Sequence, residues 1–315
     1  MTATCRICNT SADHPEYTVR EMMMGTGEPF TYFQCERCHC LQIAEFPREI
    51  ARYYPANYYS FSTTSRDKTG NRVLKWVRRI RNASSVCEKG FGNGLIRKLF
   101  PNKKLLPLMR LGLTPASRIL DVGCGAGWRL YALRESGFPN TLGVDPYLEH
   151  DLTYANGLQV LKRTVNEVEG LWDVVMFHHS LEHIPGQAAA LRAAAGLLRP
   201  GGTCLIRVPV ASSYAWEFYR EHWYQIDAPR HFYLHSYESM RRLAEQCGLV
   251  LRSTECDSTL DQFRTSELYK QGLRSFREAG FDRTQKTEWK RRAEKLNQEG
   301  RGDQAVFYLE KSGTN

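Results

Sequence analysis

A glycine-rich segment near the middle of the chain has the residue types and spacing that bind a nucleoside. Residues 121–127 have the sequence DVGCGAG, and a second acid, Asp145, stands 18 residues after Gly127. Glycines in a turn between a strand and a helix let the main chain pass close to a ligand. A carboxylate at the end of the following strand can accept hydrogen bonds from the hydroxyls of a ribose. This spacing therefore predicts a nucleoside-binding site.

The acid that precedes the glycines narrows the choice of ligand. Dinucleotide-binding turns have the pattern Gly-x-Gly-x-x-Gly, whereas Gly123, Gly125 and Gly127 form the pattern Gly-x-Gly-x-Gly. The carboxylate of Asp121 would repel a pyrophosphate, but it suits a ligand that carries a sulfonium and an ammonium group. A dinucleotide site and a glycine turn with a purely structural role remain the two alternatives.

Histidines and acids cluster in two further segments. Residues 177–185 have the sequence FHHSLEHIP directly after a strand-like run, and residues 227–231 have the sequence DAPRH. An open α/β sheet places its chemistry at the carboxyl ends of its strands. Imidazole is the side chain best matched to removing a proton near neutral pH. The alternative is that these histidines only shape a turn. The predicted catalytic residues are the candidate bases His183 and His231 with the supporting residues Glu182 and His179.

Four cysteines near the N-terminus have the spacing of a metal site. Cys5 and Cys8 form one CxxC pair, and Cys35 and Cys38 form a second. Four thiolates suit a tetrahedral zinc ion, and closure by four cysteines is typical of a structural site. We predict structural Zn²⁺ at these four residues, with free thiols or a redox pair as the alternative. Three nearby residues are spare donors that could replace one ligand: His14, His39 and Cys40.

The elements that must position these residues follow from the order of apolar and helical segments. Short strand-like runs alternate with helical ones between residues 115 and 256. Such alternation implies a mostly parallel sheet that helices cover on both faces. The expected strands are 118–122, 141–145, 158–165, 173–177 and 203–208, and the expected helices begin at Trp128, at Gln187 and after Ser236.

Together these features resemble the class I S-adenosylmethionine-dependent methyltransferases over roughly residues 115–256. The strand-like run at 305–309 is similar to the antiparallel hairpin partner of that family. The resemblance implies an α/β, Rossmann-like fold with a seven-stranded, mostly parallel sheet, and S-adenosyl-L-methionine as the cofactor. The residues that it assigns to cofactor binding are Asp121, Gly123, Cys124, Gly125, Gly127, Asp145, Thr164, Val165 and His178.

The resemblance also implies a role for each part of that set. The segment Gly123–Gly125 would lie against the methionine moiety, with Asp121 near its amino group and Asp145 at the ribose. Thr164 and Val165 would frame the adenine. The segment after the fourth strand is similar to the family's H-x-L-E-H-I/V-P segment. By that similarity the first histidine would border the cofactor, and the Glu-His pair would point towards the acceptor.

A zinc site before such a domain resembles two groups of enzymes. One comprises bacterial methyltransferases of sugar, polysaccharide and natural-product pathways, and the other is a zinc-bearing ribosomal RNA methyltransferase. The DAPRH segment and the sequence GRGDQ at residues 300–304 look more like the first group. Sugar C-methyltransferases carry a longer C-terminal domain than the roughly 60 residues that follow Cys256. The resemblance therefore implies O-methylation of a sugar, glycan or secondary-metabolite hydroxyl. An RNA methyltransferase and a non-catalytic protein with the cofactor fold are the alternatives.

The positive charge of the chain is local. The formal net charge is +9, yet 13 Lys or Arg residues and only two acids lie between Arg66 and Arg110. Residues 72–81 predict an amphipathic helix with Val73, Trp76 and Val77 on one face and basic residues on the other. Such a helix could contact an anionic membrane surface, bind RNA phosphates or pack on the catalytic domain.

These segments predict three parts of the chain and limit its environment. We expect a zinc-binding module at 1–46, a Tyr-rich and basic helical linker at 47–110, and a methyltransferase domain at 111–315 with a helical insertion around 261–300. Ten cysteines are too few for a disulfide scaffold, no apolar run reaches the roughly 18 residues of a membrane span, and the N-terminus does not resemble a signal peptide. We expect a cytoplasmic enzyme that acts on a small-molecule or glycan acceptor, with attachment to the inner face of the membrane as an alternative and nucleic acid disfavoured.

Overall fold

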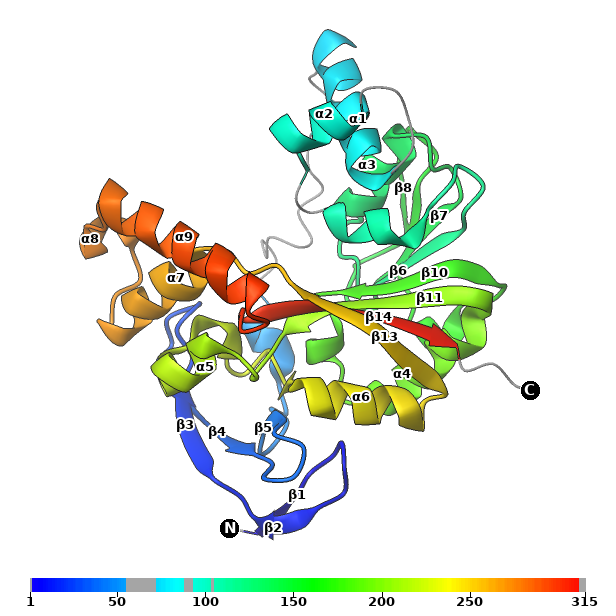
Figure 1. Ribbon diagram of the computed structural model, residues 1–315. Helices are drawn as coiled ribbons and strands as arrows, with labels where there is room; N and C mark the ends of the chain where they lie inside the picture. The colour runs from blue at the N-terminus through cyan, green and yellow to red at the C-terminus, as the bar shows by residue number, and fades with distance from the viewer. Residues whose placement is uncertain (1, 55–71, 88–92, 103–104, 312–315) are drawn as a thin grey trace. The chain divides into compact units, whose positions relative to one another are not determined.

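The computed structural model describes residues 2–54, 72–87, 93–102 and 105–311 (Figure 1). The chain divides into two compact units, and each interrupts the other along the sequence. Unit 1 comprises Met1–Pro55, His179–Leu191 and Ile206–Ser312. Unit 2 comprises Ala56–His178 and Arg192–Leu205, together with the last three residues of the chain.

The central element is an eight-stranded, mostly parallel sheet. The strands β10, β6, β7 and β9 are parallel neighbours, β13 pairs antiparallel with β14, and β8 pairs antiparallel with β9. This confirms the predicted α/β class, and β8 adds a two-residue strand to the expected seven. The strand order is β13 (Leu249–Cys256), β14 (Gln304–Lys311), β11 (Leu198–Pro209), β10 (Trp172–His178), β6 (Ile119–Val122), β7 (Thr141–Val144), β9 (Gln159–Leu161) and β8 (Leu152–Thr153).

Strand β9 is shorter than the expected run 158–165, and the hydrogen bonds that follow it give the reason. The N–H of Lys162 donates to Asp151 Oδ1 at 2.7 Å instead of continuing the ladder. The side chain of Glu167, in the short helix η4 (Val165–Glu167), then accepts from both the N–H and the hydroxyl of Thr164 at 2.8 Å. Local side-chain hydrogen bonds of this kind compete with strand pairing.

The helices of unit 2 follow from caps and apolar periodicity. Helix α3 (Trp128–Glu135) begins directly after the glycine turn, with Gly127 as its N-cap residue. Two basic helices, α1 (Arg72–Val86) and α2 (Asn93–Leu99), precede the turn element η3 (Leu106–Leu111) and the first strand of the large sheet. Helix α4 (Gln187–Leu197), rich in alanine, runs from unit 1 into unit 2.

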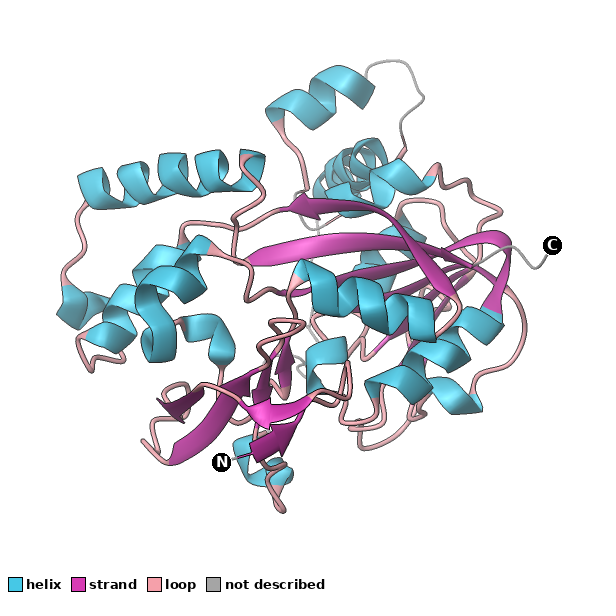
Figure 2. Ribbon diagram, turned by 60° about the horizontal axis from the view of Figure 1, so that its bottom comes forward, coloured by secondary structure: helices cyan, strands magenta, loops and turns pink. Residues whose placement is uncertain are grey.

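Unit 1 contains a second sheet that joins distant parts of the sequence. Its order is β12 (Tyr233–Leu234), β5 (Leu41–Ile43), β4 (Pro29–Gln34) and β3 (Glu16–Arg20), and β12 comes directly after the DAPRH segment. The hairpin β1 (Thr2–Thr4) and β2 (Ser11–Asp13) precedes it, and η1 (Ile50–Tyr53) follows it. The strands of both sheets are magenta in Figure 2. Strands β3–β5 therefore share one unit, and one sheet, with the strand that follows His231.

The remaining helices of unit 1 surround its C-terminal strands. Helix α6 (Tyr237–Gln246) has the expected N-cap, because the Ser236 side chain accepts a hydrogen bond from the N–H of Ser239. Between β13 and β14 the chain forms α7 (Asp261–Lys270), α8 (Phe276–Ala279) and α9 (Arg283–Gln298), drawn in orange in Figure 1. Short helices precede α6: η5 (Leu181–His183), α5 (Tyr214–Tyr219), η6 (Arg220–His222) and η7 (Tyr224–Ile226). No helix in the described part of the chain is long and apolar enough to cross a bilayer.

Candidate functional site

The glycine turn after β6 is a close-packed bend that only glycine fits well. Gly123, Gly125 and Gly127 have φ angles of 70°, 56° and 73°, which side-chain-bearing residues rarely adopt. A Cβ at Gly127 would also lie 2.6 Å from Val160 Cγ2. The N–H groups of Gly123 and Cys124 both donate to the carbonyl of Val144 at the end of β7. The turn is thereby held against the end of the neighbouring strand.

Asp145 is tied to this turn by main-chain hydrogen bonds. Its Oδ2 accepts from the N–H of Gly125 at 2.8 Å, and its Oδ1 accepts from the N–H of Tyr147 at 3.0 Å. Burial raises the pKa of Asp145, although these two amides favour the ionised form. Each carboxylate oxygen keeps a further lone pair, so the group can still accept hydrogen bonds from a diol.

Asp121 lies at the end of β6 with one carboxylate oxygen engaged and one unpaired. The side chain is 1% exposed, and Oδ2 accepts from Arg129 Nη1 of α3 at 3.1 Å. Oδ1 has no hydrogen-bond partner among the described residues. Burial raises the pKa of Asp121 to about 6, despite the opposing charge of Arg129. A buried acceptor without a donor is costly, which points to a ligand that supplies one. Sequence reasoning missed Arg129.

The other predicted cofactor residues lie at the ends of the neighbouring strands. Val165 is buried, whereas Thr164 is exposed and donates its hydroxyl to Glu167 of η4. Cys124 donates from Sγ to the carbonyl of Gly125 at 3.5 Å, and His178 is half-buried at the end of β10. Hydrogen bonds therefore join Asp145 and the glycine turn, while the contacts of Thr164 are local to its own connection.

Unit 1 gathers two imidazoles and one carboxyl from the predicted catalytic segments. The ligand-type atoms of Glu182, His183 and His231 all lie within 4.8 Å of one another. The rings of His183 and His231 meet edge to face, with centroids 4.7 Å apart. A hydrogen bond of 2.8 Å from the N–H of Phe232 to the carbonyl of Glu182 joins the two segments. The structure thus brings together residues that are nearly 50 positions apart in the sequence.

Both imidazoles have a main-chain carbonyl beside Nδ1. His231 Nδ1 lies 2.7 Å from the carbonyl of Gln225, and His183 Nδ1 lies 2.9 Å from that of Arg230. A carbonyl oxygen only accepts, so the proton of the neutral His231 ring is on Nδ1 and its lone pair is on Nε2. His183 Nδ1 also lies 2.9 Å from the hydroxyl of Tyr54, which can donate or accept. Burial lowers the pKa of His183 to about 3. Burial also lowers the pKa of His231, but the charge of Asp227 opposes this effect.

Glu182 is the most enclosed member of this group. It has no exposed surface, and burial raises its pKa to about 8. Its Oε1 lies 3.3 Å from His179 Nδ1 and 4.0 Å from His231 Nε2. Its Oε2 has no hydrogen-bond partner within the described part of the chain. The carboxyl therefore lies against the Nε2 lone pair of His231.

His179 has both ring nitrogens engaged by the protein. Arg207 donates to its Nε2, and Arg207 Nε also pairs with Asp257 Oδ2 at 2.7 Å. This leaves the His179 proton on Nδ1, where it points to Glu182. The backbone of His179 has a φ of 54°, so the chain bends sharply where it leaves β10. Both nitrogens of the His179 ring are therefore occupied by protein groups, and its Nδ1–H orients Glu182.

A buried arginine holds the DAPRH segment in place. Arg230 is fully buried and donates from Nε to Asp227 Oδ2 at 2.9 Å, from Nη2 to Glu21 Oε1 at 3.1 Å and from Nη1 to the carbonyl of Tyr53 at 3.4 Å. Burial acts to raise the pKa of Asp227, but the hydrogen bond and charge of Arg230 hold it below its usual value. Sequence reasoning missed Glu21, because nothing near it in the chain marks a partner for position 230.

The N-terminal strands also contact the same segment through the main chain. The hydroxyl of Tyr32 donates to the carbonyl of His231 at 2.9 Å, and the N–H of Ile43 donates to the carbonyl of Phe232 at 3.0 Å. The hydroxyl of Ser236 donates to the carbonyl of Cys38, within the second CxxC turn. The fold of residues 1–46 therefore sets the position of His231.

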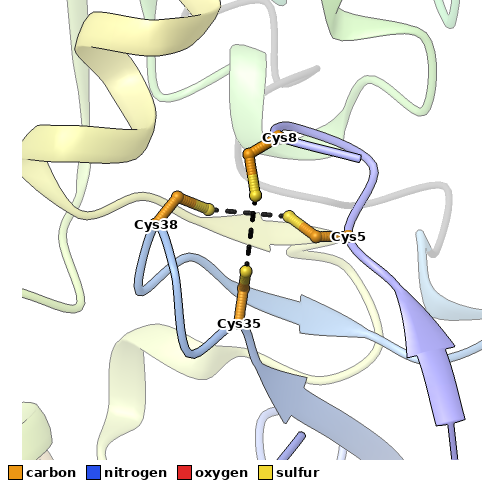
Figure 3. A group of neighbouring side chains, drawn as sticks. All are labelled: Cys5, Cys8, Cys35 and Cys38. Atoms are coloured by element: carbon orange, nitrogen blue, oxygen red, sulfur yellow. Dashed lines mark hydrogen bonds between the residues drawn. The ribbon is translucent and has the colours of Figure 1, made fainter. Parts of the chain in front are cut away.

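The four N-terminal cysteines converge on one point, as Figure 3 shows. The Sγ atoms of Cys5 and Cys38 lie 3.5 Å apart, as do those of Cys8 and Cys35, and all four lie within 4.8 Å of one another. A tetrahedral zinc ion with bonds of about 2.3 Å needs sulfur atoms about 3.8 Å apart, so the donor set fits. Cys40 and the histidines at 14 and 39 are outside this group of four among the described residues.

The comparisons with known proteins point to methyltransferases. A family model described as "Methyltransferase domain" matches residues 91–254, which is just over half of the chain. The ubiquinone biosynthesis O-methyltransferase of Xanthomonas campestris pv. campestris (strain B100) is 33% identical over 115 residues, which cover 32% of this chain and 48% of that protein. The enzyme of the same name from Sodalis glossinidius (strain morsitans) is 30% identical over 119 residues, covering 35% and 48%. The chain thus spans about half the length of these curated relatives.

Solved structures resemble the chain more distantly. The mycolic acid cyclopropane synthase CmaA1, solved with SAH and CTAB, has 17% sequence identity and a TM-score of 0.44, with 68% of this chain and 87% of that chain covered. The mitomycin 7-O-methyltransferase MmcR has 12% identity and a TM-score of 0.40, with 74% and 54% covered. The family model over residues 91–254 is the match that decides: this chain belongs to the methyltransferase domain family.

Proposed function

We propose that this chain is an S-adenosylmethionine-dependent methyltransferase that methylates a hydroxyl group of a sugar, a glycan or a secondary metabolite. The observation that carries the proposal is the unpaired, buried Oδ1 of Asp121 beside three glycines with positive φ. A buried carboxylate oxygen at a glycine turn suits the ammonium group of this cofactor. The O-methyltransferase names of the curated relatives support oxygen as the acceptor atom.

The residues of unit 2 fit the cofactor part by part. Asp121 Oδ1 would accept a hydrogen bond from its ammonium group, and the main chain of the glycine turn would hold its methionine moiety. Asp145 keeps lone pairs for the ribose hydroxyls, and the buried side chain of Val165 offers an apolar contact for adenine. When bound, the cofactor supplies a methyl group that an oxygen nucleophile can attack.

His231 is the residue that we assign as general base. Its Nδ1–H is held by the carbonyl of Gln225, so Nε2 is free to accept the proton of the acceptor hydroxyl. Asp227 Oδ2 lies 3.8 Å from that nitrogen and stabilises the imidazolium that forms. His183 is the weaker candidate, because burial and the neighbouring ring lower its pKa to about 3. Glu182, which His179 orients, borders the Nε2 atom.

The four N-terminal cysteines would bind a structural Zn²⁺ ion. Their sulfur atoms form a closed set of four, which leaves no position for a substrate. Gln42 Nε2 donates to Cys5 Sγ at 3.0 Å, and such a bond stabilises a thiolate ligand. The ion would hold the two CxxC turns together, and with them the sheet that contacts the His231 loop.

Calorimetry and a methyl-transfer assay together test this function. The full chain should bind S-adenosylmethionine, and Asp145→Ala should weaken that binding by more than about tenfold. With a panel of nucleotide sugars, lipid-linked glycans and phenolic metabolites, methyl-labelled cofactor should yield a product whose new methyl signal is that of an O-methyl group. Absence of cofactor binding would make the chain a non-catalytic member of the family. Methylation of RNA, with no transfer to the other acceptors, would replace the proposed substrate class.

A further inference from the structure

Exposed apolar side chains are concentrated on two short helices of unit 2. Of the fifteen large apolar side chains that are exposed among the described residues, seven lie on α1 and α2 or directly after α2. Trp76 is 62% exposed and Phe100 is 67% exposed. A single exposed apolar side chain is normal on a protein surface, whereas a group of large ones marks an interaction site. The seven residues are Val73, Leu74, Trp76, Val77, Leu95, Leu99 and Phe100.

Helix α1 is anchored at one end and projects at the other. Residues 82 and 84–86 are buried, and Asn102, which follows α2, hydrogen-bonds to Asn82 and Ser85 at 2.8 and 2.9 Å. These contacts fix α2 beside α1, as Figure 1 shows. Residues 73–79, in contrast, are exposed on every side of the helix. The second half of α1 is therefore buried within unit 2, while the side chains at 73–79 are exposed.

The charge around these apolar residues has one sign. Within 72–87 and 93–100, the sequence contains seven Lys or Arg residues and no Asp or Glu. Lys75, Arg78 and Arg79 are exposed on the side of α1 opposite Val73 and Val77, and Lys98 is exposed on α2. An apolar stripe flanked by basic residues is the pattern of helices that lie in the interface of an anionic bilayer.

We propose that α1 and α2 form a membrane-docking surface that inserts Trp76, Leu95 and Phe100 into the interface of an anionic lipid bilayer. The basic residues on the same two helices would then contact the lipid headgroups. A second copy of this chain is a poor occupant, because the same positive charges would face one another. RNA is a poor occupant as well, since the seven exposed apolar side chains have no role against phosphates.

Vesicle sedimentation of the full chain tests this surface. The chain should bind vesicles of mixed phosphatidylglycerol and phosphatidylcholine, and it should not bind vesicles of phosphatidylcholine alone. The triple variant Lys75→Gln/Arg78→Gln/Arg79→Gln should weaken binding on the order of a hundredfold. Trp76→Ser should weaken vesicle binding roughly tenfold, because it removes a large apolar side chain from the bilayer interface. All of these side chains are exposed, so the variants should retain the wild-type circular dichroism spectrum and melting temperature.

Matched variants elsewhere in the chain provide the control. Lys286→Gln/Lys290→Gln/Arg291→Gln on α9 removes the same charge, and Leu171→Ser removes an apolar side chain that is 51% exposed. Both should bind vesicles as the wild type does. Equal losses for the α9 and α1 variants would overturn the proposal, as would a lack of binding to anionic vesicles. Tight, salt-sensitive RNA binding that depends on α1, without vesicle binding, would assign the surface to RNA. Vesicle binding requires no methyl transfer, so this test is independent of the proposed function.

Discussion

Arg230 and Glu21 form a fully buried ion pair across 209 positions of sequence, with Nη2 and Oε1 3.1 Å apart. Glu21 follows strand β3 and also accepts from the N–H groups of Met24 and Thr26, at 2.7 and 2.9 Å. Arg230 precedes His231 and holds Asp227, which faces His231 Nε2. One buried pair therefore connects the turn after β3 to the loop that carries the proposed base.

Breaking this pair from the glutamate side should destabilise the protein strongly. Glu21→Gln leaves the buried Arg230 guanidinium with Asp227 as its one carboxylate partner, so the loss of stability should approach, without exceeding, the cost of about 3–5 kcal/mol for a fully broken buried pair. Chemical denaturation should report this loss in the free energy of unfolding. Glu310→Gln breaks an exposed pair with Arg252 and should leave the midpoint almost unchanged. Equal denaturation midpoints for the two variants would show that the buried pair does not contribute to the stability of the fold.

The cysteine cluster should bind one zinc ion per chain. Cys35→Ser removes one of the four sulfur donors, so its zinc content by atomic absorption should fall well below that of the wild type. Its thermal stability should fall as well, because the CxxC turns contact the His231 loop through Cys38 and Ser236. The control is Cys247→Ser, which changes a buried cysteine outside the cluster and should keep the full zinc content. A Cys35→Ser variant that retains its zinc would contradict this ligand set.

The two imidazoles should differ in their importance for turnover. His231→Ala should lower the methyl-transfer rate by about 10²–10⁴-fold, which is the usual contribution of a general base. Its affinity for S-adenosylmethionine should stay within a few-fold of wild type, because the ring is hydrogen-bonded to Gln225 and is not part of the glycine turn. His150→Ala alters an exposed histidine and serves as the control. Full turnover in His231→Ala would show that His231 is not the general base.

Glu182 should make the protein less stable as the pH rises. Its pKa in the folded state is about 8 against an ordinary value of 4.5, so folding favours the protonated form. The unfolded state binds fewer protons than the folded state between these two values. Stability therefore decreases as the pH rises through this window, and it levels off above about pH 8. Denaturation of the wild type and of Glu182→Gln at a series of pH values measures the effect.

The difference between those two curves isolates Glu182 from other buried acids such as Asp121. The free energy of unfolding of the wild type should fall more steeply than that of Glu182→Gln across the window. Glu294→Gln, on the exposed side of α9, should follow the wild-type curve. Parallel curves for wild type and Glu182→Gln would mean that the carboxyl is ionised in the folded state throughout.

Gly127 should tolerate no side chain. Alanine there would combine a φ of 73° with a Cβ 2.6 Å from Val160 Cγ2, so the glycine turn must shift. We expect Gly127→Ala to weaken S-adenosylmethionine binding at least about tenfold in calorimetry. Gly196→Ala places its Cβ in open space on α4 and should leave binding unchanged, with stability equal or higher. Unchanged cofactor affinity in Gly127→Ala would separate the turn from the cofactor site.

Several features of the site were predictable because they depend on consecutive residues. The glycine turn needs three residues that accept a positive φ, and only glycine does so without strain. The N-cap of α6 was visible in Ser236, and the spacing of each CxxC pair is short enough to mark a turn. The α/β class followed from the alternation of apolar runs, and the sheet confirms it.

Other features were hidden because they depend on how the elements pack. Arg129 follows Asp121 by only eight residues, yet nothing in the sequence marks the pairing of their side chains. Strand β12 pairs with β5 of the N-terminal sheet, and Tyr32 donates to the main chain at His231, 199 positions away.

The sequence alone determined the parts that local backbone geometry and short spacing decide: the glycine turn, the CxxC pairs, the caps and the alternation of strands and helices. Only the tertiary structure decided which histidine has its lone pair on a nitrogen that faces carboxylates, and which basic helix leaves its apolar side exposed. These depend on burial and on hydrogen bonds between segments up to 209 residues apart. Such contacts arise when elements pack, and no local pattern encodes them.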